Sequence, residues 1–147
     1  MAVCMALVGV TFLNMAQPCL ATDRTGAEIA KLRGNWTIVA IETGDPAFKE
    51  FEKFAKGGRV EVTQDHFLFK GVNGILQERY RLNANRPSKE IDWISKKGEP
   101  IPGIYRLEGD TLTICTVDYP GQQRPTEFKA KSGKNRQGLL ILKRAKP

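Results

Sequence analysis

Few residues in this chain carry side chains that commonly do chemistry. His66 is the only histidine, and it follows Asp65 at an expected hairpin, while Cys115 lies in the middle of an expected strand. A nucleophilic thiol needs a nearby base and an electropositive, exposed setting, and the one histidine is remote from Cys115 in sequence. We expect a solvated turn histidine and a buried or half-buried thiol; a ligand role for His66 is the alternative. Cys4 and Cys19 lie in the signal peptide predicted below, so the mature chain would keep one histidine and one cysteine. These are too few for the usual four-ligand zinc site, so no metal and no cofactor are expected.

Four acids are candidates for general acid–base catalysis, which would require two carboxyl groups close together in space. They are Asp92, Glu108, Asp110 and Glu127. Asp110 follows Gly109 in a turn, where aspartate is common for backbone reasons. Asp92 and Glu127 recur beside arginines, and we expect them to form ion pairs at one end of the barrel. The sequence therefore predicts no catalytic residue, and a weak enzyme that uses Asp92 or Glu127 remains an alternative.

The chain is basic, with 23 Lys and Arg against 16 Asp and Glu and a net charge of +7. A positive protein outside the cytoplasm can bind polyanions such as acidic glycans, lipopolysaccharide or membrane head groups. Nucleic acid is not expected, because the aromatic residues follow the core phase and form no exposed stacking platform. A charge of this size also serves ordinary solubility. The basic residues concentrated in the later strands are Arg79, Arg81, Lys129, Lys131, Lys134, Arg136, Lys143 and Lys146.

The first 22 residues contain no charged side chain, and residues 5–13 form an apolar run. Cys19-Leu20-Ala21 places small residues at the two positions that signal peptidase recognises. We therefore predict a signal peptide over residues 1–21 and an exported protein, periplasmic or extracellular, with one domain over residues 22–147. No Lys or Arg precedes the apolar run. A lipid anchor on Cys19 and an uncleaved membrane anchor are the alternatives; the run is short for a membrane span.

Two short helices are predicted in the N-terminal half. The first begins at Thr25, which forms a capping box with Glu28, and ends before Gly34. The second begins at Asp45 and places three phenylalanines, residues 48, 51 and 54, on one stripe before a pair of glycines ends it. This helix is expected either to plug the end of a filled barrel, which is favoured, or to cover a pocket.

The rest of the chain has a hydrophobic period of two, which is typical of strands. Two-residue turns such as Asn73-Gly74 and Gly109-Asp110 separate several of them, and no helix of 10–15 residues intervenes, so the strands should form an antiparallel meander. Closure removes the exposed edges. The predicted fold is therefore mainly β, a small barrel of about eight strands. The expected strands are residues 35–43, 59–64, 66–72, 75–83, 90–95, 103–108, 111–117, 126–131 and 138–144.

One phase of these strands is almost wholly apolar and is expected to face inward; in the first strand it includes Trp36, Ile38 and Ala40. Arg144 shares the phase of the last strand's core residues, so it should lie over Trp36 and close one end of the barrel by a cation–π contact. The other inward residues are Val60, Val62, Phe67, Phe69, Leu76, Tyr80, Leu82, Ile91, Trp93, Tyr105, Leu107, Leu112, Ile114, Phe128, Leu140 and Leu142.

A pocket, if the barrel is hollow, should be apolar and lie under the second helix. The hydroxyl groups of Tyr80 and Tyr105 are the expected orienting groups, and a filled barrel without a ligand is the alternative. The residues predicted to line the pocket are Phe51, Phe67, Phe69, Tyr80, Trp93 and Tyr105.

Gly34-Asn35-Trp36 at the start of the first strand and Arg144 near the end resemble the lipocalin-like pattern of Gly-x-Trp with a late arginine. With residues 91–93, 103–115 and 124–128, the chain from about residue 31 to 146 resembles a family of small, exported, uncharacterised domains that are frequent in planctomycete bacteria. This resemblance implies a lipocalin-like barrel and no particular activity.

These observations favour an exported, non-enzymatic binding or structural domain. It would hold a small apolar ligand or engage an envelope partner, such as an anionic component. An interaction or inhibitor module that acts through its loops, residues 118–124 among them, is the alternative.

Overall fold

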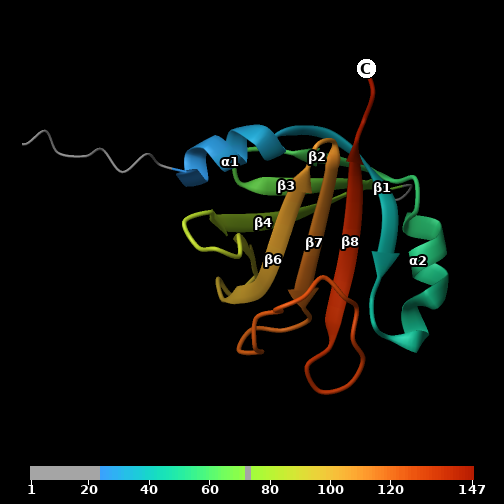
Figure 1. Ribbon diagram of the computed structural model, residues 1–147. Helices are drawn as coiled ribbons and strands as arrows, with labels where there is room; N and C mark the ends of the chain where they lie inside the picture. Colours follow the sequence, from blue (N-terminus) through green and yellow to red (C-terminus); the bar gives the residue numbers. More distant parts are fainter. Residues whose placement is uncertain (1–23, 72–73) are drawn as a thin grey trace, which may run out of the picture.

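The computed structural model describes residues 24–71 and 74–147, and these form a mainly β structure with two short helices in the N-terminal half (Figure 1). The helical elements are α1 (Arg24–Leu32), a single 3-10 turn η1 (Pro46–Phe48) and α2 (Lys49–Ala55). The strands are β1 (Gly34–Glu42), β2 (Arg59–Val62), β3 (His66–Gly71), β4 (Gly74–Asn83), β5 (Glu90–Ile94), β6 (Pro100–Glu108), β7 (Thr111–Val117) and β8 (Gln137–Arg144).

The eight strands form one closed antiparallel barrel in chain order, so the predicted fold class is confirmed. β8 pairs with β1 to close it, and this register sets Trp36 opposite Arg144. A bulge between Ile38 and Ala40 interrupts the pairing. The bulge corrects the predicted phase of β1, because it moves Ile41 in place of Ala40 onto the core.

The predicted strand at residues 126–131 is wrong. This segment is irregular, and only a single bridge joins Lys131 to Gln137. Both edges of β7 are already occupied by β6 and β8, so no edge is free to accept another strand. The segment instead lies against the outer face of the sheet: the Arg106 guanidinium lies 4.7 Å from the centre of the Phe128 ring, so Phe128 does not face inward.

Most of the predicted inward residues form the core of the barrel. Trp36, Phe67, Leu112 and Leu142 are fully buried. The ring of Phe67 packs edge to face against Tyr80 and Trp93, at 4.9 and 4.8 Å between ring centres. Besides Ala40 and Phe128, Leu76 is an exception, since 59% of it is exposed.

Helix α1 closes one end of the barrel. Its last residue, Leu32, is fully buried, and the indole Nε1 of Trp36 donates a 2.8 Å hydrogen bond to the Leu32 carbonyl. The Arg144 guanidinium lies 4.2 Å from the centre of the Trp36 ring and donates to the carbonyls of Lys31 and Arg33. The last carbonyls of a helix have no partner within the helix. Trp36 and Arg144 together supply partners for three of them.

Glu28 helps to hold α1 on the barrel and does not form the predicted capping box. Its carboxylate lies 2.9 Å from the Lys31 ammonium and 2.7 Å from that of Lys89, and the Tyr105 hydroxyl donates to it. Burial would raise the pKa of Glu28, but the hydrogen bonds from Lys89 and Lys31 outweigh burial and lower it. Thr25 lies inside the helix, and its hydroxyl accepts from the Ala84 N–H. The capping-box prediction was wrong because Glu28 reaches across to Lys89, just before β5, and to Tyr105 on β6 rather than back along the helix.

The predicted signal peptide, residues 1–21, lies outside the described residues, so its cleavage stays a prediction. Across residues 24–71 and 74–147, neither helix has the length and apolar character needed to cross a membrane.

Candidate ligand-binding cavity

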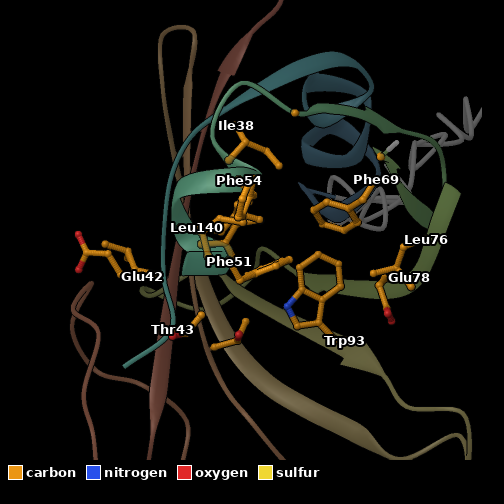
Figure 2. A pocket seen from close by; sticks show the side chains of 18 of the residues that line it. Ile38, Glu42, Thr43, Phe51, Phe54, Phe69, Leu76, Glu78, Trp93 and Leu140 are labelled. Carbon is orange, nitrogen blue, oxygen red and sulfur yellow. The ribbon is translucent and has the colours of Figure 1, made fainter. Parts of the chain in front are cut away.

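The end of the barrel away from α1 is hollow. A cavity of about 1240 Å³ lies between α2 and the inner faces of the strands, and its walls are mainly apolar (Figure 2). Glycines at positions 71, 74 and 138 line this end. Glycine contributes no side chain to this end of the barrel, which is one physical reason why the packed core does not extend to it. The larger apolar lining residues are Ile38, Ile41, Phe51, Phe54, Phe69, Ile75, Leu76, Trp93, Ile101, Ile114, Val117, Leu139 and Leu140.

Helix α2 covers the cavity without filling it. Its seven residues are all described and none is buried; Phe51 is 54% exposed and Phe54 is 83% exposed, although both line the cavity. Figure 2 shows Phe51 directed from α2 toward Trp93 on the facing wall. Two of the three phenylalanines of the predicted stripe, Phe51 and Phe54, therefore cover a hollow end, and the favoured expectation of a plug is wrong.

Local contacts fix both ends of α2. Asp45 accepts a hydrogen bond from the Ala47 N–H at the start of η1, and its carboxylate pairs with Arg136. Glu52 accepts from the backbone N–H of Thr43 at 2.7 Å, which ties the helix to the end of β1. This hydrogen bond from Thr43 is the main cause that lowers the pKa of Glu52. Beyond the helix, Gly57 takes a φ of +85°, a left-handed conformation that favours glycine.

The structure separates the six predicted pocket residues into two groups. Phe51, Phe69 and Trp93 line the cavity. The other three, Phe67, Tyr80 and Tyr105, are at most 4% exposed and lie in the packed core toward the closed end. Alternation along a strand determines which face a side chain occupies, but not its height along the barrel axis. For that reason the same inward phase includes both wall and core residues.

The tyrosine hydroxyl groups predicted to orient a ligand have protein partners instead. Tyr80 donates a 2.9 Å hydrogen bond to the Thr63 carbonyl, and Tyr105 donates to Glu28. Neither tyrosine is among the cavity-lining residues. Burial, the largest cause, raises the pKa of Tyr80 to about 12 and also raises that of Tyr105.

Glu78 is a lining residue that the predicted inward set omits. Its position between Leu76 and Tyr80 in a strand of period two is the signal that would have identified it. Among the other polar lining residues, Thr116 shares the inward phase of Ile114 on β7. Lys70 pairs with Glu61 at 2.7 Å, and Asp118 lies 3.4 Å from Arg136. Burial raises the pKa of Asp118, and Arg136 opposes this effect.

The residues first considered for chemistry do not form a reactive site. Cys115 is a buried free thiol whose Sγ donates to the Lys129 carbonyl, and burial raises its pKa. His66 Nδ1 lies 2.7 Å from a carboxylate oxygen of Asp65. No group of three metal-binding side chains occurs in the described part of the chain.

The four candidate acids are each opposite a different cation. Asp92 lies 2.8 Å from Arg124 and Glu127 lies 2.6 Å from Lys131, so both form the expected ion pairs. Glu108 lies 3.2 Å from Arg106, and Asp110 lies 3.8 Å from Arg144. The structure does not bring these carboxylates together, and none of them lines the cavity.

The basic residues do not gather on one face of the described barrel. Arg79 and Arg81 lie on the exposed side of β4, and Lys143 lies on that of β8. β4 and β8 are four strands apart in a closed barrel of eight, so they are on opposite sides. Arg136 and Lys131 are also occupied in ion pairs with acids of this chain.

Comparison with known protein families, with curated proteins and with solved structures gives no match to this chain. The functional argument therefore depends on the barrel and its cavity.

Proposed function

We propose that this protein is an exported, non-enzymatic binding protein with a lipocalin-like barrel, and that it holds a small apolar ligand in the cavity beneath α2. The observation that carries the proposal is the hollow, mainly apolar end of the barrel. Its volume of about 1240 Å³ is somewhat above the ~300–1,000 Å³ usual for sites that enclose a small molecule. The set of sequence motifs between about residues 31 and 146, which resembles that of exported lipocalin-like domains, supports the same proposal.

The exposed apolar surface at the cavity mouth also supports it. Phe51, Phe54, Ile75 and Leu76 line the cavity, and each is more than half exposed. Soluble proteins rarely expose a contiguous apolar patch of this kind unless it serves binding. A ligand in the cavity would remove much of this surface from water, at ~25 cal/mol for each Å² of apolar area buried.

The test is a fluorescence titration with diphenylhexatriene, an uncharged hydrocarbon that emits strongly only in apolar surroundings. The wild-type protein should bind it saturably, and Phe51→Asp should weaken binding about tenfold or more, because a charge would face the cavity. Phe48→Asp is the matched control, since Phe48 is 50% exposed in the same segment and does not line the cavity.

Three results would contradict the proposal. The first is a folded wild-type protein that binds no probe. The second is a Phe48→Asp variant that loses as much affinity as Phe51→Asp. The third is a concentration-dependent dimer in sedimentation that excludes the probe, because a second copy of the chain would then cover the mouth.

A further inference from the structure

Of the ionisable residues that line the cavity from a described strand, one lies on the inward phase. Glu78 sits between Leu76 and Tyr80 on β4 and directly opposite Phe67 on β3. Tyr80 pairs with Trp93 on β5, so Glu78 is the diagonal neighbour of Trp93. Figure 2 shows Glu78 with Leu76 on the β4 side of the cavity. Its cross-strand surroundings are thus aromatic and apolar.

The Glu78 carboxylate is half-buried, and within the described residues no hydrogen bond or ion pair engages it. Other partly buried acids of this chain do have cationic partners: Glu28 contacts Lys89, and Asp92 contacts Arg124. A buried or half-buried charge is costly unless it is paired. A ligand that covered the Glu78 carboxylate would therefore have to supply a partner for its charge.

The two basic residues of the cavity lining do not supply that partner. Arg59 and Lys70 precede or follow the inward residues Val60 and Phe69, so they occupy the outward phase, and both are exposed. Lys70 is also paired with Glu61 at 2.7 Å. Neighbouring residues of β4, Arg79 among them, point to the outer face by the same alternation.

We propose that the ligand is a hydrophobic amine, and that Glu78 binds its protonated nitrogen while the apolar walls enclose its body. This inference rests on the proposed function and specifies its ligand class. A charge-assisted hydrogen bond to a carboxylate is about twice as strong as a neutral one, and low-dielectric surroundings strengthen it further. The ring faces of Trp93 and Phe69, which also line the cavity, attract cations as well.

The test is displacement of bound diphenylhexatriene by three competitors of equal chain length: decylamine, decanol and decanoate. Decylamine should compete about tenfold better than decanol, and decanoate should be the weakest of the three. The comparison is stringent because the protein's net charge of +7 disfavours a cationic ligand in general.

Three variants of two glutamates separate a local contact from a general charge effect. Glu78→Gln should lower the affinity for decylamine to that for decanol, and the quantity compared is the ratio of these two affinities within each protein. Glu42→Gln is the matched control, because Glu42 also lines the cavity but is exposed at the end of β1. It should keep the preference for the amine. Glu78→Lys should reverse the preference toward decanoate, which tests the assignment even if Glu78→Gln binds the probe poorly.

The outcomes separate a failure of the amine assignment from a failure of the proposed binding function on which it rests. A wild-type protein that does not bind diphenylhexatriene contradicts the proposed function. Binding of diphenylhexatriene with equal competition by decylamine and decanol, or with decanoate as the best competitor, overturns only the assignment of an amine. An equal loss of amine preference in Glu42→Gln also overturns it, since the preference would then arise from the overall field.

Discussion

Arg144 should stabilise the closed end of the barrel by more than its contact with Trp36. Its guanidinium lies 4.2 Å from the centre of the Trp36 ring, and it donates to the Lys31 carbonyl at 2.7 Å and to the Arg33 carbonyl at 3.2 Å. Arg144→Ala removes all three contacts at once. It also frees the C-terminal carbonyls of α1, the helix that covers this end.

The expected loss is about 2 kcal/mol of unfolding free energy. The cation–π contact contributes ~0.5–1 kcal/mol at a partly exposed site. Each of the two hydrogen bonds contributes ~0.5–1 kcal/mol, at the lower part of the usual range, because water can reach the freed carbonyls. The 3.8 Å contact with Asp110 adds little, since Asp110 is mostly exposed. Trp36→Ala should cost more, ~3–5 kcal/mol, because it empties a fully buried aromatic site.

Urea unfolding followed by tryptophan fluorescence and far-UV circular dichroism measures these losses. With an m-value of ~2 kcal/mol per molar urea, Arg144→Ala should lower the midpoint by about 1 M. Arg144→Lys should recover only part of this, because an ammonium lacks the planar fork that reaches two carbonyls. Lys143→Ala is the control, since Lys143 is the exposed neighbour on the same strand, and it should change stability by less than ~0.5 kcal/mol. An Arg144→Ala midpoint as close to wild type as that of Lys143→Ala would refute the assignment.

Three further predictions concern the N-terminus, the buried acid and the free thiol. The protein isolated from its host should begin at Thr22, and N-terminal sequencing that finds Met1 or a lipid-modified Cys19 would contradict this. The lowered pKa of Glu28 should stabilise the fold above its ordinary value of 4.5 and lose that contribution as pH falls below it. Glu28→Gln should therefore be less stable at neutral pH and lose less stability on acidification; parallel losses of urea midpoint in both proteins would argue against the pairing. Cys115 should react with a thiol reagent roughly a hundredfold more slowly in the native protein than in urea, and similar rates would show that it is not shielded.

The sequence by itself determined the fold class and most of the core. A hydrophobic period of two, with short turns and no long helix between the strands, leaves few arrangements other than an antiparallel meander, and closure is the way to bury both of its edges. The same periodicity identified Trp36, Phe67 and Leu142 as core residues, because the side-chain direction in a strand is a local property. It failed where the local rule is broken, at the bulge after Ile38 in β1.

Only the tertiary structure decided where along the barrel each inward residue lies. Phe69 and Trp93 face the cavity, whereas Phe67 is packed in the core, although all three share one phase. That height depends on strand register and on barrel closure, which arise from contacts between residues far apart in the chain. The same long-range contacts excluded residues 126–131 from the sheet, since β8 already occupies the second edge of β7. They also left Glu78 on the cavity wall without a partner among residues 24–71 and 74–147, because whether a charge is paired depends on what the folded chain brings beside it.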